Sequence, residues 1–183
     1  MLKQKGLKNC TRLLKFNGGV TMVVGVTGHR SNKLWGYDYS DYRYIKLKNM
    51  FITLLQNNNI TDAWTGMAVG VDTIFALAVL ELKESGMDIK LHCAIPCRNQ
   101  EKLWPIEAQE LYNSILDRAD EVILVSDDEY NPKLMQIRNE YIVDRIDTLI
   151  AVFNGYPVGG TWNCVNYARG VGKDIFYIDP TLL

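Results

Sequence analysis

Short apolar segments alternate with longer amphipathic segments over most of the chain, and this alternation restricts the fold more than any other feature. Strands that alternate with helices predict a mostly parallel sheet with helices on both faces. We therefore expect a single doubly wound, Rossmann-like α/β domain over residues 22–183. The expected strands are 22–26, 62–65, 88–96, 120–126, 147–155 and 173–179; the expected helices are 39–58, a second that ends near 85, 105–119, 132–146 and 161–170.

The second expected helix lies in the stretch TGMAVGVDTIFALAVL, residues 65–80, which is apolar on every side. Its apolar run from Met67 to Leu80 has 14 residues and contains Asp72, whereas a membrane span needs ~20 predominantly apolar residues. The stretch is therefore expected to be a buried helix with a glycine-rich entry. Asp72 has the chemistry of a helix cap, and Gly66 and Gly70 can adopt backbone angles that other residues avoid.

The composition indicates a globular protein of the cytoplasm with no metal and no cofactor. Apolar residues make up 48% of the 183 residues and charged residues 22%, which is ordinary for such a protein. The net charge of −1 argues against general coating of nucleic acid. Four cysteines without a CxxC pair, and only two histidines, argue against zinc and favour reduced thiols. The acidic turn at 127–129 has the oxygens for a magnesium ion, but a solvated turn is the better interpretation.

The first 21 residues are basic and precede the first strand-like segment directly. Gly18 and Gly19 can be encoded GGA GGT, a bacterial ribosome-binding sequence, which would place a start codon at Met22. Residues 1–21 are therefore expected to be either a disordered tail or upstream sequence that was translated by a mistaken choice of start. The codons of Gly18 and Gly19 distinguish these alternatives.

Polar and glycine residues follow each of the first five expected strands. In doubly wound folds, ligands bind beyond the carboxyl ends of the strands, and helix N-termini and arginines hold phosphate groups. A phosphate-bearing ligand is therefore expected at this rim. The candidate ligand-binding residues are Thr27, Gly28, His29, Arg30, Gly66, Met67, Ala68, Gly70, Asp72, Pro96, Arg98, Trp104, Arg138, Asn139, Gly159, Gly160, Thr161 and Trp162.

Several of these segments resemble signatures of one superfamily. TGMAVGVDTIFALAVL resembles the SGxAxGID signature of Smf/DprA-like Rossmann proteins, and VTGHR, residues 138–155 and residues 159–180 resemble the wider SLOG superfamily. Within that superfamily the chain is most similar to the YpsA family, from Met22 to about Pro180. The resemblance implies a Rossmann-like domain that binds nucleotides or nucleotide-derived ligands. Some relatives hydrolyse nucleoside monophosphates, others sense NAD-derived or cyclic nucleotide signals, and DprA-like members bind single-stranded DNA.

The sequence departs from the phosphoribohydrolase members at the position of their catalytic glutamate. Their PGGxGTxxE motif corresponds here to VGGTWNC, so that Cys164 stands where the glutamate would be. A cysteine does not replace a carboxylate as acid or base without a shifted pKa. The resemblance therefore implies that the phosphate-binding half of the motif is kept and the hydrolytic half is lost, and we assign no catalytic residue.

Three functions stay open at this point. The first is binding of a nucleotide-derived small molecule, such as an NAD-derived, ADP-ribose-like or cyclic nucleotide signal, by a sensor or sequestering protein, with Trp104 or Trp162 against the base or ribose. The second is hydrolysis of a nucleotide by another carboxylate, with Asp72, Glu107 and Asp127 as candidates. The third is DprA-like binding of single-stranded nucleic acid, against which the near-neutral charge counts. A homo-oligomer, with a two-fold dimer as the default, is expected. For Arg138, phosphate binding and pairing with Glu140 or Asp144 on a solvated face are equal alternatives.

Overall fold

Six parallel strands form one sheet in the order β4-β3-β2-β1-β5-β6. The computed structural model describes residues 21–183, so the interpretation of residues 1–21 falls, but for one residue, outside the described part. The expected doubly wound α/β domain with a parallel sheet is confirmed. The elements are β1 (Met22–Gly28), η1 (Ser31–Lys33), α1 (Tyr42–Gln56), β2 (Ile60–Thr65), α2 (Val71–Glu84), β3 (Lys90–Ile95), α3 (Ile106–Leu116), β4 (Glu121–Leu124), α4 (Pro132–Val143), β5 (Thr148–Val152), α5 (Gly160–Gly170), β6 (Asp174–Ile178) and η2 (Pro180–Leu182).

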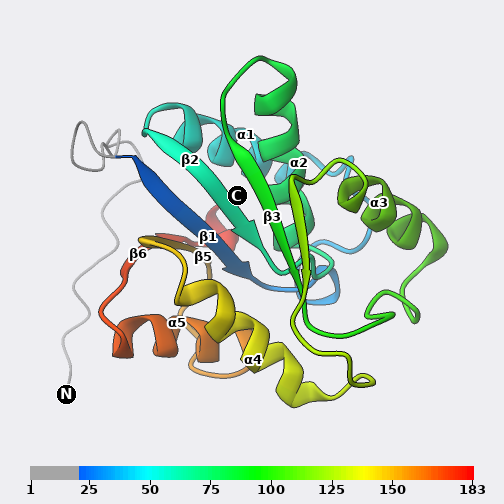
Figure 1. The fold of residues 1–183 in the computed structure, drawn as a ribbon. Coiled ribbons are helices and arrows are strands. Elements are labelled where there is room, and N and C mark those ends of the chain that lie inside the picture. Colours follow the sequence, from blue (N-terminus) through cyan, green and yellow to red (C-terminus); the bar gives the residue numbers. More distant parts are fainter. Residues whose placement is uncertain (1–20) are drawn as a thin grey trace.

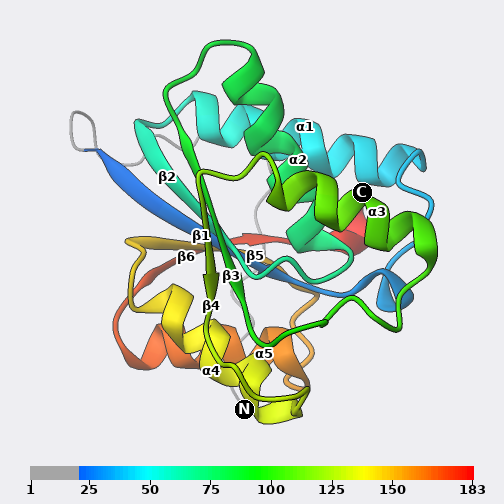
Figure 2. The ribbon, with the colours of Figure 1, turned by 45° about the vertical axis from the view of Figure 1, so that its right-hand side comes forward.

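The helices cover the sheet unequally. In Figure 1, α1, α2 and α3 lie on one side of the sheet, and α4 and α5 lie on the other. The turned view in Figure 2 keeps the same two layers, with α4 and α5 below the strands. The chain adds strands in one direction from β1 to β4 and then returns to place β5 on the other side of β1. The strand order therefore reverses between β1 and β5, and such a switch point is where ligands bind in open α/β sheets.

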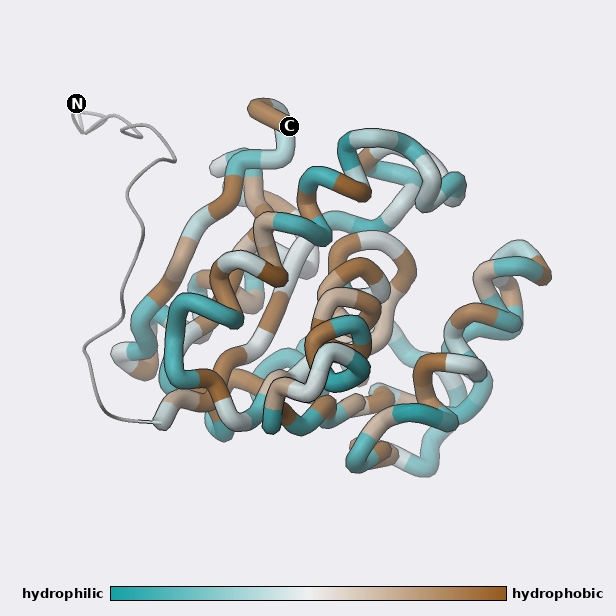
Figure 3. Tube along the Cα trace, turned by 90° about the horizontal axis from the view of Figure 1, so that it is seen from above, coloured by the Kyte–Doolittle hydropathy of each residue, from teal (hydrophilic) through white to brown (hydrophobic). Residues whose placement is uncertain are grey.

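The helix α2 is the core helix that its apolar sequence predicts. Ten of its 14 residues are buried, and it packs against α1 and the sheet. Ring packing between Phe51 of α1 and Phe75 of α2 joins the two helices, with centroids 5.2 Å apart. Figure 3 shows long hydrophobic stretches in the interior, whereas the outer segments alternate between hydrophobic and hydrophilic residues. Within residues 21–183, no helix is long and apolar enough to cross a membrane.

Several element boundaries differ from the expected ones. Helix α1 begins at Tyr42 and not at 39, because the Asp41 side chain accepts the Arg43 amide and caps the helix there. The 3-10 turn η1 was not expected. The prediction that Asp72 caps α2 is wrong: the N-cap is Gly70, and Asp72 lies inside the first turn.

Gly28, the last residue of β1, lets the start of α2 approach the strand closely. A Cβ atom at Gly28 would lie 2.4–2.6 Å from three side-chain atoms of Val71. Val71 is β-branched and has little freedom to rotate away. Only glycine fits here without moving α2 away from β1.

We predict that Gly28→Ala lowers the free energy of unfolding by about 1–3 kcal/mol, because overpacking at a rigid contact forces backbone shifts. Urea unfolding monitored by circular dichroism measures the change. Gly170→Ala is the matched control, since a Cβ there meets no atom within 4 Å, and we expect a change within about 0.5 kcal/mol. Equal effects of the two substitutions would contradict the packing argument.

Candidate functional site

A buried ion pair joins the two helical layers at the carboxyl end of β2. Arg138 Nη1 of α4 donates to Asp72 Oδ2 of α2 over 3.2 Å, and the two residues are only 5% and 6% exposed. Burial raises the pKa of Asp72, and Arg138 and the Ala68 amide counteract part of that rise. The expected pairing with Glu140 or Asp144 on a solvated face does not match this arrangement, because the guanidinium lies inside the molecule and pairs with Asp72. Phosphate binding by Arg138 stays a prediction.

The side chain of Arg138 requires glycine at position 66. A Cβ at Gly66 would lie 0.8 Å from Arg138 Nη1, so only glycine leaves room for the guanidinium. The expectation of backbone angles that other residues avoid is confirmed for Gly70, whose φ is +103°. In the first half of the loop, the residue with a positive φ is Met67, at +54°, and not Gly66. The glycine-rich entry to α2 is therefore shaped by the ion pair beneath it.

Amide groups in and next to the loop at residues 66–70 donate hydrogen bonds to other groups of the protein. The Ala68 amide donates to Asp72 Oδ2 over 3.2 Å, and the Gly70 amide donates to the Tyr39 hydroxyl over 3.0 Å. The Val71 amide donates to the His29 carbonyl over 3.3 Å. These groups would have to break protein hydrogen bonds to bind a phosphate. The loop is consequently a rigid support.

The start of α5 is open. Residues 154–160 are exposed, and Gly159, the N-cap, has φ of +91°. The first amides of a helix have no partner within the helix, and within residues 21–183 no side chain caps α5. These amides, which include those of Gly160 and Thr161, can therefore donate hydrogen bonds to an anionic ligand. The helix dipole also favours negative charge at this end.

Charged and polar groups from β1 and β5 meet beside this open helix start. The His29 ring follows β1, and Asn154, which follows β5, lies within hydrogen-bonding reach of it. Burial lowers the pKa of His29, Asn154 partly offsets this, and nearby Lys33 lowers it further. Lys33 Nζ lies 3.9 Å from the position that a Cβ on Gly159 would take. Among residues 21–183, His29 Nε2 is buried without a hydrogen-bond partner.

Lys33 and Asn154 were not among the expected site residues. Both reach the site because β1 and β5 are neighbours, and the sequence does not give the strand order. The residues VTGHR, by contrast, did place His29 at the rim. The sequence gives only one indication for Lys33, namely that it lies four residues after His29. It is the last residue of the 3-10 turn η1.

The two candidate stacking residues lie in different surroundings. Trp162 of α5 stacks on Phe153 with centroids 6.1 Å apart, and Phe153 in turn contacts the His29 ring at 6.0 Å. Trp104 packs edge-on against Tyr112 at 5.4 Å, on the side of α3. Trp162 is therefore the tryptophan next to the open helix start.

The other expected rim residues fall into exposed and buried groups. Arg98 is exposed and pairs with Asp127, Nη2 to Oδ1 being 2.5 Å. Arg30 is exposed, Asn139 half-buried and Pro96 buried. Thr27 and Thr161 are buried, at 7% exposure each. Among residues 21–183, no group of three or more histidine, cysteine, aspartate or glutamate side chains could hold a metal ion.

Cys164 lies in the interior and does not face a ligand. It is 2% exposed, and burial raises the pKa of its thiol to about 11, although a contact with Thr27 and the charge of Arg138 act in the opposite direction. A thiol that stays protonated at neutral pH does not serve as a general base. The position that would carry a catalytic glutamate is thus occupied by a neutral, buried group.

Residues 24–180 match the model of the YpsA family, described as the YspA SLOG family. The chain belongs to this family. It is 32% identical over 153 residues to the SPbeta prophage-derived protein YoqJ of Bacillus subtilis, covering 74% of this chain and 89% of that protein. It is 27% identical over 156 residues to a UPF0398 protein of Bacillus cereus, covering 82% and 84%.

The fold is also similar to that of solved DNA processing proteins. DprA from Streptococcus pneumoniae superposes with a TM-score of 0.58 at 17% identity over 87% of this chain. DprA from Helicobacter pylori, solved to describe its single-stranded DNA binding mode, superposes with a TM-score of 0.59 at 16% identity over 86%. This chain spans only 50% and 65% of those two proteins. At such identities the likeness shows a shared fold.

We predict that Arg138→Met and Asp72→Asn each lower the free energy of unfolding by about 3–5 kcal/mol, because each leaves a buried polar partner without its counterpart. The double variant should cost less than the sum of the two by more than about 0.5 kcal/mol. Urea unfolding of the four proteins measures this coupling. Arg98→Met, which breaks an exposed pair, is the control and should cost about 0–1 kcal/mol. Additive costs would contradict the assigned pair.

Proposed function

We propose that this protein binds a nucleotide-derived small molecule through a phosphate group at the start of α5, and that it senses or sequesters this molecule without cleaving it. The observation that carries the proposal is the buried, unpartnered His29 Nε2 beside an uncapped helix start, among residues 21–183. A buried polar atom without a partner costs free energy unless something else satisfies it. The side chain of Asn154 lies within hydrogen-bonding reach of the ring, and in this proposal a phosphate oxygen at the open amides is the partner of Nε2.

The position of this group supports a ligand role. His29 and Asn154 follow the two strands between which the strand order reverses, where doubly wound folds bind their ligands. The exposed Lys33 adds a positive charge next to Gly159. The amides of α5, an imidazole and an ammonium group together offer several donors and little competing negative charge, as a phosphate requires.

The residues around this group have two further roles in the proposal, support of the site and contact with the base or ribose. The loop at residues 66–70 holds the floor of the rim in place through its internal hydrogen bonds. Trp162 lies one residue beyond Thr161 and is half-buried, so part of its ring remains available to the base or ribose of a ligand. Trp104 is the less suitable partner because it packs against Tyr112 of α3 and not beside the start of α5.

The surroundings of the family's catalytic position favour binding over hydrolysis. Cys164 is buried and protonated. Of the alternative carboxylates, Asp72 is held by Arg138 and Asp127 by Arg98. Glu107 is exposed on α3, the helix next to Trp104. None of the three lies in the group formed by His29, Lys33 and Asn154.

We predict that a phosphate-bearing nucleotide binds at the start of α5 and is recovered intact. Mass spectrometry after incubation with nucleotides, cyclic nucleotides, NAD and ADP-ribose would show a compound depleted from solution and released unchanged by heat. Lys33→Met should weaken its binding about ten- to a hundred-fold, since a charge-assisted contact contributes roughly 1.5–3 kcal/mol. Calorimetric titration measures this loss.

Lys173→Met is the matched control, because Lys173 lies at the other end of α5, just before β6, and should leave affinity unchanged. Equal affinities of the two variants would contradict the proposed phosphate position. Release of a base and a sugar phosphate would instead establish hydrolysis. Binding of an oligonucleotide in place of any mononucleotide, with an affinity that falls steeply with salt, would indicate the DprA-like alternative.

A further inference from the structure

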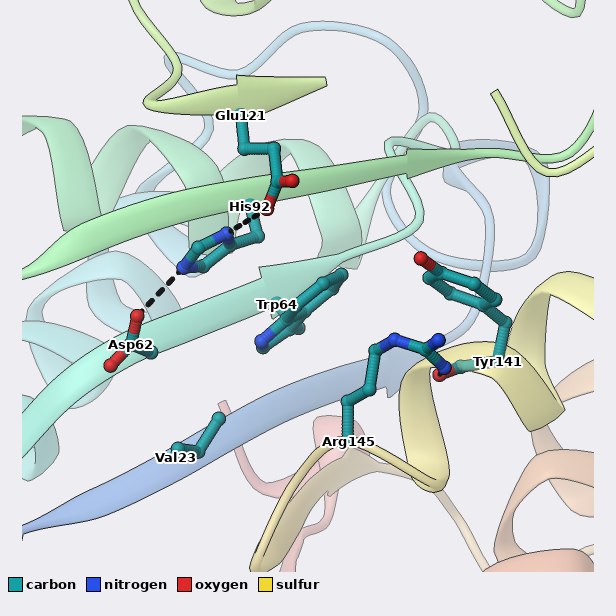
Figure 4. Close-up of a pocket in the computed structure, with 7 residues that line it drawn as sticks. All are labelled: Val23, Asp62, Trp64, His92, Glu121, Tyr141 and Arg145. Carbon is teal, nitrogen blue, oxygen red and sulfur yellow. Dashed lines mark hydrogen bonds and ion pairs between the residues drawn. The ribbon is translucent and has the colours of Figure 1, made fainter. Parts of the chain in front are cut away.

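A second, acidic and aromatic hollow lies on the sheet face that α4 and α5 leave partly uncovered. Figure 4 shows its lining, with side chains from β1 to β4 and from α4 with the turn that follows it. The hollow has a volume of about 490 Å³ and opens broadly to solvent. It is separate from the rim, since Val23 and Asp62, which line it, lie in the first halves of their strands.

Charged residues on this sheet face are unusual. The faces of a parallel sheet are ordinarily covered and apolar. Here His92 lies between two carboxylates, with Nε2 at 2.8 Å from Asp62 Oδ1 and Nδ1 at 2.8 Å from Glu121 Oε2. Both contacts are hydrogen bonds only when both ring nitrogens carry protons. The imidazole is thereby fixed in place, and each carboxylate keeps one oxygen that His92 does not use.

Two flat stacks complete the hollow. The Trp64 and His92 rings lie parallel, with centroids 4.6 Å apart and planes at 11°. The Arg145 guanidinium carbon lies 3.4 Å from the centroid of the Tyr141 ring. Trp64 and Tyr141 meet at 6.1 Å and 60°. The faces of Trp64 and His92 cover each other, so the hollow presents the edges of these two rings, with carboxylate acceptors on one side and the guanidinium of Arg145 on the other.

We infer that this hollow binds an uncharged, amino-bearing heteroaromatic ring of the nucleobase class. The ring would lay one face against the edges of the Trp64 and His92 rings, in the edge-to-face arrangement that aromatic pairs prefer. Its amino group would donate to the second carboxylate oxygen of Glu121, and a ring carbonyl or ring nitrogen would accept from Arg145. The acceptor oxygens of the hollow match an amino-bearing base or nucleoside, whereas a phosphate carries no donor for them.

The state of Asp62 agrees with an acceptor role. Partial burial raises the pKa of Asp62, but hydrogen bonds from Thr61 and His92 together outweigh this, so the pKa is lowered. The side chain is 29% exposed, and that of Glu121 is 54% exposed. Both carboxylates are therefore within reach of a ligand that enters from solvent.

The test compares nucleosides that differ by one amino group. Adenosine and cytidine should bind at least about tenfold more tightly than inosine and uridine, which carry a carbonyl in place of the amine, because a hydrogen bond to a charged group contributes roughly 1.5–3 kcal/mol. The indole N–H signal of Trp64 in ¹H–¹⁵N spectra reports on the hollow. It is assigned with Trp64→Phe and distinguished from the signals of Trp35, Trp104 and Trp162.

Glu121→Gln should abolish the preference for amino-bearing nucleosides. Glu110→Gln is the matched control, an exposed glutamate on α3, and should keep the preference. Lys33→Met should also keep it, which separates this site from the rim. Equal binding of adenosine and inosine, no binding up to the solubility of the nucleosides, or a preference that survives Glu121→Gln would overturn the inference. A Trp64 signal that moves on dilution of the protein alone would show a second copy on this face and would also overturn it.

Discussion

The pair formed by Arg138 and Asp72 is the contact on which the architecture of the rim depends. It links α4 on one face of the sheet to α2 on the other, past the carboxyl end of β2. Two buried charges are tolerated only when they are paired and hydrogen-bonded, so the Ala68 amide is drawn to the same carboxylate. The chain then has room only for glycine at Gly66. One electrostatic requirement thus explains the glycine, the bent loop and the buried start of α2.

Two helix starts at this rim consequently differ in their surroundings. Around the glycine-rich start of α2, the amides of Ala68, Gly70 and Val71 already donate to Asp72, Tyr39 and His29. The start of α5 is exposed and uncapped within residues 21–183, and it lies at the switch point of the sheet. On the uncovered sheet face, the carboxylates around His92 offer hydrogen-bond acceptors, which the start of α5 does not. In the two functions that we propose, the start of α5 binds an anion and the sheet face binds an amino-bearing ring.

The alternation of apolar and amphipathic segments predicted the strands, the helices and the parallel sheet, because these follow from local periodicity. It did not predict the strand order, so it did not indicate that Asn154, which follows β5, lies beside His29, which follows β1. Lys33 follows β1 on the turn η1, which the periodicity did not predict either. The partner of Arg138 could not be predicted either, since Asp72 lies 66 positions away and Glu140 and Asp144 lie within helical reach of it. Glycine motifs alone indicated a ligand site both at the loop 66–70 and at the start of α5. The hydrogen bonds that the amides of Ala68, Gly70 and Val71 make within the protein could not be predicted from these motifs.

The most direct test of the proposed phosphate position is a residue-by-residue NMR titration with inorganic phosphate and with AMP. If the start of α5 holds the anion, the amide signals of Gly160 and Thr161 shift most with both probes, and only AMP also moves the Trp162 indole signal. The amides of Ala68 and Gly70, which already donate within the protein, should shift little. The largest shifts at Ala68 and Gly70, or shifts spread over exposed lysines far from the rim, would contradict this account.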